Sequence, residues 1–191
     1  MLMSSFMAAP SCCKNEGWTE RERNIINSQE PVMRVLTVDS PEDSLTLHTP
    51  SKNLGRDLVR SKEYKTLEQK MLNTVTAPQY DGVGIAGPQV GILRRIVAVQ
   101  RFDKNGEPFE VYPDIHIVET RGEKEPGPEG CLSVPERKGN VLRYKDITVK
   151  YLSPVTMEDT TETITGFTAV IFQHECDHLD GVVYTDILFP D

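Results

Sequence analysis

The sequence predicts an α+β fold in which the sheets are mostly antiparallel, and three observations support this class. The length of 191 residues suits one domain with a substantial core. Hydrophobic residues make up 38% and charged residues 26% of the chain, which is typical of a globular protein and not of a disordered one. Short β-branched runs follow one another in groups, and two longer segments carry apolar residues at helical spacing.

We expect a flexible tail over residues 1–30 and a single domain over residues 31–191. Residues 1–13 are small and apolar, with no basic residue before them. The alternatives to a plain tail are the remainder of a secretory leader and a lipid-attachment site at Cys12. Residues 14–30 are polar and form either a short helix or a continuation of the tail.

The elements of the first half are predicted from local patterns. Residues 32–38 alternate apolar residues and predict a strand or an extended lead-in, whereas residues 39–50, rich in Ser, Pro and Asp, predict a loop. A helix capped by Ser61 follows and ends before Pro78. Its apolar residues recur at helical spacing, and they are Tyr64, Leu67, Met71, Leu72 and Val75.

The second half predicts a series of strands and then a second helix. The expected strands, in chain order, are 95–100, 109–112, 114–120, 141–151 as one or two strands, and 160–166. The first two form a hairpin around the turn at 103–106. Residues 122–128, rich in Pro, Gly and charge, predict a loop, and residues 182–189 predict an apolar extended end.

A glycine-rich segment at 82–91 lies between the two halves. Its glycine spacing is similar to that of a dinucleotide-binding loop, but Pro88 stands where a helix would have to open, so we reject that function. The glycines instead allow the backbone to approach a ligand closely or to adopt unusual dihedral angles. Gln89 then offers an amide that both donates and accepts hydrogen bonds. The alternative is a glycine-rich turn with a solvated glutamine.

The strongest chemical motif is His174-Glu175-x-x-His178. On a helix, positions four apart lie on one face, so the two imidazoles can bind one metal ion. Glu175 is placed to take a proton from a metal-bound water without being a ligand itself. The alternative is a helix that carries two histidines by chance.

A catalytic zinc-type site needs a third protein ligand. The candidates are Cys131, Cys176, His116 and an acidic residue. Cys176 lies two positions from each motif histidine and is expected on the opposite face of the helix as a buried thiol. His116 occurs in a strand-like run, which is typical of an ordinary surface histidine. Cys131, in a tight Gly-Cys-Leu turn, is the best third ligand on chemical grounds.

Three segments in order carry a resemblance to the peptide deformylases. They are GVGIAGPQ at 82–89, EGCLS at 129–133 and QHECDH at 173–178. The resemblance extends from about residue 35 to residue 189, and it departs from the family pattern at Gly87, where alanine is commoner, and at Tyr112, where asparagine is usual. It implies an α+β fold with antiparallel sheets packed around a central H-E-x-x-H helix, and it makes residues 31–191 the catalytic domain.

The same resemblance implies the roles of the site residues. The metal ligands are Cys131, His174 and His178. Glu175 is the general acid/base, while Gln89 and the backbone N–H of Leu132 stabilise the oxyanion. The residues expected on the substrate side are Val83, Gly84, Glu129, Phe167 and Val170, with Glu129 also paired with Arg143. Ile171 is a further candidate for an apolar methionine slot; for all the apolar members of this set, a purely structural core role is the alternative.

The implied reaction is metal-dependent hydrolysis that removes the N-formyl group from the formylmethionine of newly made polypeptides, by a metal-bound hydroxide with Glu175 as general acid/base. The implied cofactor is one divalent metal ion. Fe(II) is the expected ion, and Ni(II), Co(II) or Zn(II) are its substitutes. The expected partners are N-formylmethionyl peptides and, transiently, the ribosome. The expected location is cytoplasmic.

The net charge of the chain argues against several other classes of binding partner, and its cysteine count indicates its compartment. The formal net charge of −8 argues against broad binding of nucleic acids or anionic membranes, and no stretch has the length of a membrane span. Four cysteines are too few for a disulfide framework, so a reducing compartment is expected. Two other functions stay open: a metallopeptidase with a third ligand other than Cys131, and a non-catalytic metal-binding or peptide-binding module.

Overall fold

A computed structural model describes residues 17–190. Its strands form two antiparallel three-stranded sheets, so the predicted α+β class is confirmed. In the described residues, the helices are α1 (Glu20–Ile26), α2 (Pro41–Leu47), α3 (Gly55–Val59), α4 (Lys62–Val75) and α5 (Gly166–Leu179), with 3₁₀ turns η1 (Gly87–Val90) and η2 (Tyr184–Asp186).

The first sheet has the strand order β1 (Gly84–Ala86), β2 (Ile96–Gln100) and β3 (Phe109–Pro113). The predicted hairpin of 95–100 with 109–112 is confirmed, since Val97 pairs with Tyr112 and Gln100 with Phe109. The glycine-rich segment supplies β1 at the edge of this sheet and then η1. The strand β1 contacts α5, which brings the glycine-rich segment next to the motif helix.

The second sheet has the order β4 (His116–Cys131), β5 (Val134–Leu152) and β6 (Asp159–Thr165). The predicted loop at 122–128 is wrong, because these residues continue β4. Prolines 126 and 128 are tolerated there because β4 is an edge strand and needs ladder hydrogen bonds on one side only. A register shift between Arg121 and Lys124 surrounds Gly122, whose φ is +76°.

The predicted helix after Ser61 is confirmed as α4, and the Ser61 hydroxyl accepts a hydrogen bond from the Tyr64 N–H at 3.1 Å. The predicted loop at 39–50 is wrong, because it contains α2. Ser40 caps this helix, Pro41 occupies its first turn and Leu47 is fully buried, so a short helix forms where composition alone indicated a loop.

The segment 32–38 is an extended lead-in and not a strand. Its backbone N–H groups bond to other segments, with Leu36 donating to the Gln89 carbonyl and Val38 to the Ser133 carbonyl. The segment 182–189 was expected to be extended, but it contains η2, and both Val183 and Tyr184 are buried.

Residues 17–30 pack on the body of the protein and therefore do not behave as the flexible tail predicted for residues 1–30. Ile26 is fully buried, and Glu22 of α1 forms a buried ion pair with Arg94 at 2.7 Å. The Trp18 indole donates to the Ser61 hydroxyl at 3.1 Å. The possible leader and the lipid site at Cys12 lie outside the described residues.

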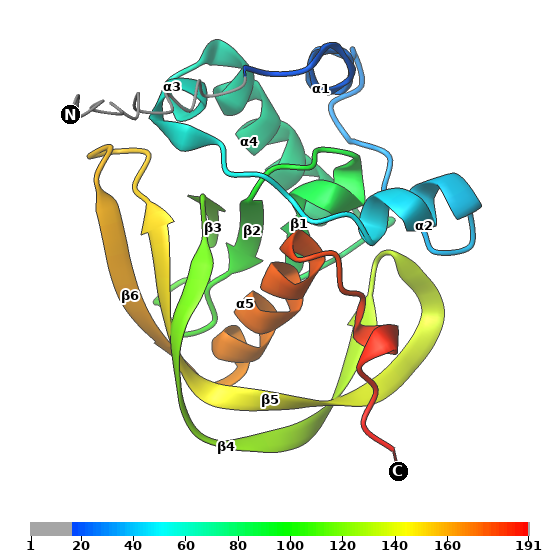
Figure 1. Ribbon diagram of the computed structural model, residues 1–191, viewed down its shortest axis with the longest axis vertical. Coiled ribbons are helices and arrows are strands. Elements are labelled where there is room, and N and C mark those ends of the chain that lie inside the picture. Colours follow the sequence, from blue (N-terminus) through cyan, green and yellow to red (C-terminus); the bar gives the residue numbers. More distant parts are fainter. Residues whose placement is uncertain (1–16, 191) are drawn as a thin grey trace, which may run out of the picture.

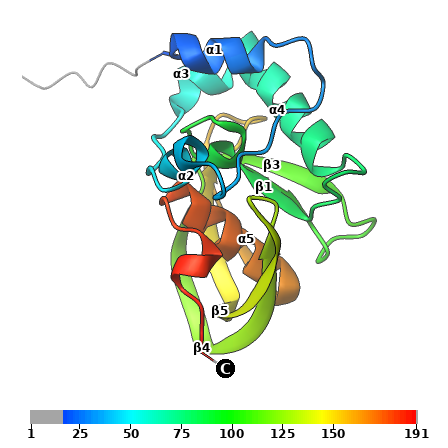
Figure 2. The same cartoon turned by 90° about the vertical axis from the view of Figure 1, so that its right-hand side faces the viewer.

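The helix α5 contacts β1 and β2 of the first sheet and all three strands of the second (Figure 1). Figure 2 shows α1, α3 and α4 gathered at the far end from the β4–β5 ribbon. In the core around α5, Phe172 and Leu179 of this helix pack with residues from both sheets, among them Val97, Val99, Ile147, Val149 and Ile164. In residues 17–190, none of the helices has the length and apolar character needed to cross a membrane.

Candidate active site

His174 and His178 lie one turn apart on α5, and their ring centroids are 5.0 Å apart. The opposite side of the helix enters the core, where Cys176 is 4% exposed. Burial raises the pKa of the Cys176 thiol. Cys176 is therefore a buried neutral thiol, as the helical spacing predicted.

The structure brings Cys131, from the end of β4, to the two histidines. The ligand atoms of the three side chains all lie within 4.8 Å of one another, and Cys131 Sγ is 3.1 Å from His178 Nε2. His116, at the start of β4, is not in this group, and its Nε2 lies 3.3 Å from Asn53 Oδ1. One thiolate and two imidazoles form a three-ligand set that suits a divalent transition metal with an open position.

Glu129 connects this cluster to a buried ion-pair network. Its Oε2 lies 2.8 Å from His174 Nδ1, and both of its oxygens accept from Arg143, at 2.7 and 3.1 Å. Burial would raise the pKa of Glu129, but the hydrogen bonds of His174 and Arg143 outweigh it and lower the pKa to about 2. The ionised carboxylate orients His174 so that Nε2 is the ring nitrogen available for a metal. Arg143 also donates to Asp177 at 2.6 Å, a contact that the sequence did not predict.

Glu175 lies beside the cluster and is 3% exposed. Its Oε2 is buried and has no hydrogen-bond partner among the described residues, and burial raises its pKa to about 7. The carboxylate faces the backbone of β1 so closely that a Cβ at Gly84 would lie 2.4 Å from Glu175 Oε1. A carboxyl group that titrates near neutrality can both accept and return a proton.

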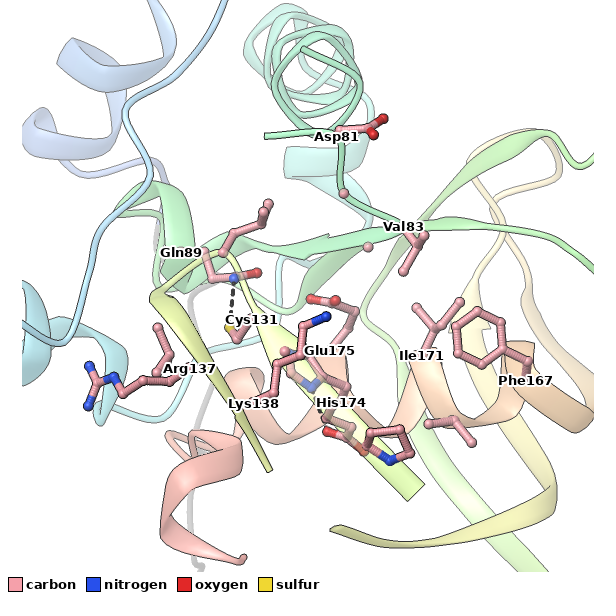
Figure 3. A pocket seen from close by; sticks show the side chains of 18 of the residues that line it. Asp81, Val83, Gln89, Cys131, Arg137, Lys138, Phe167, Ile171, His174 and Glu175 are labelled. Atoms are coloured by element: carbon pink, nitrogen blue, oxygen red, sulfur yellow. Dashed lines mark hydrogen bonds and ion pairs between the residues drawn. The ribbon is translucent and has the colours of Figure 1, made fainter. Parts of the chain in front are cut away.

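Gln89 is held in η1 with its amide oriented toward Cys131. The Gln89 Oε1 accepts from the Ala86 N–H at 2.8 Å, which identifies Nε2 as the atom that faces the site. Gln89 Nε2 lies 3.5 Å from Cys131 Sγ, the dashed line in Figure 3, and 3.2 Å from the Ser133 hydroxyl. Gln89 is 1% exposed, so the alternative of a solvated glutamine is wrong. Ser133, two residues after Cys131, is a contact that the sequence analysis missed.

A cavity of about 690 Å³ opens beside the cluster. Every predicted metal-binding, catalytic and substrate-side residue except His178 lines it. Phe167 and Val83 are 55% and 37% exposed and lie together at one end of the cavity (Figure 3). They are not core residues, whereas Ile171 is 4% exposed and serves both the cavity wall and the core. The Leu132 side chain packs near Gly82. The charged residues of the lining, which the sequence analysis missed, are Asp81, Glu136, Arg137 and Lys138.

The family model described as polypeptide deformylase matches residues 32–190 of the chain. The chain belongs to the polypeptide deformylase family. Enzymes of this family remove the N-formyl group from new polypeptides by metal-dependent hydrolysis, and this is the activity of the chain. The resemblance deduced from the three motifs is thus confirmed.

Relatives and solved structures agree with this assignment. The peptide deformylase of Leptospira biflexa is 33% identical over 164 residues, which cover 82% of this chain and 88% of the relative. The crystal structure of the Thermotoga maritima peptide deformylase superposes with a TM-score of 0.71 at 33% identity, and the match covers 83% of this chain and 99% of that one. A Met-Ala-Ser-bound class I type b peptide deformylase from Acinetobacter baumannii gives a TM-score of 0.72 at 32% identity, over 82% and 98% of the two chains.

Proposed function

We propose that this deformylase acts on the formylmethionine of new polypeptides, with Cys131, His174 and His178 holding one divalent metal ion. The observation that carries the proposal is the convergence of these three side chains beside Glu175, whose Oε2 has no partner among the described residues. A metal held by this set supplies Lewis acidity, which lowers the pKa of a coordinated water and polarises a carbonyl group. Proton transfer, charge stabilisation and substrate positioning are carried out by residues of the chain.

Glu175 is the general acid/base of the proposal. It accepts a proton from the water that attacks the formyl carbon and returns that proton to the departing amine. The raised pKa, about 7, suits both halves of this transfer near neutral pH. Glu129 supports the reaction indirectly, because its carboxylate holds Nδ1 of His174.

The formyl oxygen gains negative charge as the water attacks, and Gln89 Nε2 and the Leu132 N–H are its proposed donors. The Gln89 amide is already oriented by Ala86, so it needs little reorganisation to donate. Loss of one such donor typically costs about 10²–10³ in rate.

The methionine side chain is proposed to occupy the apolar end of the cavity, against Val83, Phe167 and Val170. Val83 directly precedes β1, whereas Phe167 and Val170 lie on one face of α5, and all three line the same cavity as Glu175. The backbone at Gly84, on the edge strand β1, is proposed to bond the substrate peptide. The solved relative with Met-Ala-Ser bound supports a peptide that begins with methionine as the occupant.

Fe(II) is proposed as the native metal, with Ni(II), Co(II) or Zn(II) as substitutes, because a mixed thiolate and imidazole set suits these ions. The proposed location is the cytoplasm, near the ribosome, where formylated chains emerge. The free thiols of Cys131 and Cys176 support a reducing compartment.

The test is the release of formate from formyl-Met-Ala-Ser. The protein is purified without oxygen and assayed after chelation and after loading with Fe(II), Ni(II), Co(II) or Zn(II). We expect formate release to depend on the metal, and the rate of formate release ranks Fe(II) and its substitutes in one experiment. Folded, metal-loaded protein that releases no formate would refute the proposed substrate, and formate release that survives complete chelation would refute the metal.

A further inference from the structure

We propose that Tyr184, in the 3₁₀ turn η2, is a positioning residue whose ring fixes the orientation of the His174 imidazole for metal binding. The inference rests on the metal site of the proposed function. It concerns a residue outside the three sequence motifs, in a segment whose pattern predicted only an extended apolar end.

The Tyr184 ring stacks on His174. The two ring centroids are 6.2 Å apart and the planes are inclined by 27°. This spacing is within the range in which offset aromatic pairs attract each other. Tyr184 is 2% exposed, so water does not compete for the face of its ring.

Tyr184 acts on His174 through its aromatic ring and not through its hydroxyl group. The hydroxyl oxygen is buried and has no hydrogen-bond partner among the described residues. A buried hydroxyl without a partner does not stabilise the folded state, so the side chain contributes through its ring, which packs with Val134 and Val141 and also stacks on His174. A phenylalanine would provide the same ring face without the buried hydroxyl.

Stacking adds a constraint that the hydrogen bond of His174 does not provide. The imidazole is held covalently at Cγ, and the contact of Glu129 Oε2 with Nδ1 restrains one further atom at the edge of the ring, which leaves small rotations of the ring plane about the Cβ–Cγ bond. The face of the neighbouring Tyr184 ring, inclined by 27°, limits this rotation. Nε2 is then directed at the point that Cys131 and His178 also face. Loss of a hydrogen-bonded partner that orients a metal ligand typically costs about 10–100-fold in metal affinity, and we expect the lower end of this range for loss of the stacked ring.

Tyr184 can hold His174 because its own segment is attached on both sides. Before it, Val183 is fully buried in a cluster with Val134 and Val141. After it, the Phe189 N–H donates to the Asn140 carbonyl at 2.7 Å. The segment is red in Figure 1, and its turn η2 contacts both β4, which ends at Cys131, and β5, which begins at Val134.

The test compares Tyr184→Leu and Tyr184→Phe with the same substitutions at Tyr64. Tyr64 is a matched control because it is also 2% exposed and also has a buried hydroxyl without a partner, but it packs in the core around α4. Three quantities are measured for each protein: the dissociation constant of Co(II) by competition with a chelating dye, the visible absorption spectrum of the Co(II) form, and the urea midpoint of the chelated protein.

We expect Y184L to raise the Co(II) dissociation constant by about tenfold or more and to alter the spectrum, while Y184F stays within about twofold of the parent. Y64L should lower the urea midpoint as Y184L does, yet bind Co(II) like the parent. Equal Co(II) affinity in Y184L and the parent, or equal losses in Y184L and Y64L, would overturn the inference. If Y184L does not fold, Tyr184→Met replaces it under the same criteria. A parent protein that binds no Co(II) would refute the metal site of the proposed function itself.

Discussion

The backbone of Gly84 and the carboxylate of Glu175 occupy adjoining space. A Cβ at Gly84 would lie 2.4 Å from Glu175 Oε1 and 2.9 Å from its Cδ. The φ of Gly84 is not positive, so the requirement for glycine is one of space and not of backbone conformation. The glycine of the first motif is therefore explained by the glutamate of the third, although 91 positions separate them in the sequence.

Gly84→Ala should displace the Glu175 carboxylate and lower kcat by about 10²-fold, because a misplaced catalytic group loses alignment with the reacting atoms. Bound metal should remain, since the ligands are not touched. Gly127→Ala is the matched control, because its Cβ would meet nothing within 4 Å. Formate release and metal content measured together check the prediction, and a G84A enzyme as active as G127A would contradict it.

Glu175→Gln should retain metal and lose turnover by about 10²–10⁴-fold, because the amide cannot transfer the proton. The substitution preserves the shape of the side chain in its buried position. Metal content by elemental analysis and formate release by a coupled assay provide the measurement. Activity close to that of the parent would remove Glu175 from the mechanism.

Cys131→Ala should lose the metal, whereas Cys176→Ala should retain it. Of these two thiols, Cys131 shares the 4.8 Å cluster with the two histidines, whereas Cys176 lies in the core on the other side of α5. Metal content after gel filtration distinguishes the two variants. Full metal retention by C131A would favour the metallopeptidase alternative, in which another residue completes the set.

Glu22→Gln should destabilise the protein by roughly 3–5 kcal/mol near neutral pH, because it leaves Arg94 buried without its ionised partner. Burial alone would raise the pKa of Glu22, but its hydrogen bonds with Arg94 and Thr19 lower it below the usual 4.5. The unfolded chain therefore takes up a proton at a higher pH than the folded one, and the stability that Glu22 provides is lost as pH falls through its folded pKa.

Urea unfolding of E22Q and the parent at several pH values checks this prediction. The difference between their unfolding free energies should be constant above about pH 5.5 and should shrink below 4.5. A difference that does not change with pH would mean that Glu22 acts through packing alone. Either result also measures how firmly α1 is attached to the body of the protein.

Local patterns predicted the elements whose stability is local. Ser61 and the apolar spacing that follows it defined α4, and the turn at 103–106 defined the β2–β3 hairpin. The loop predicted at 122–128 was wrong because pairing with β5 extends β4 through a proline-rich stretch that has no strand propensity of its own. The helix α2 was missed because its stability depends on a cap at Ser40 and on the burial of Leu47 against distant residues.

The sequence by itself determined the chemistry of this protein. His174, Glu175 and His178 lie within five residues, and their helical spacing predicts a metal pair with an adjacent base. The sequence also favoured Cys131 as the third ligand, but only the tertiary structure places its thiol within 4.8 Å of the two histidine ligand atoms, because 43 positions separate Cys131 from His174. The same is true of the Gly84–Glu175 contact, the Glu129–His174 hydrogen bond and the Tyr184 stack. Each is a distance between segments that only long-range packing brings together, and no local pattern encodes such a distance.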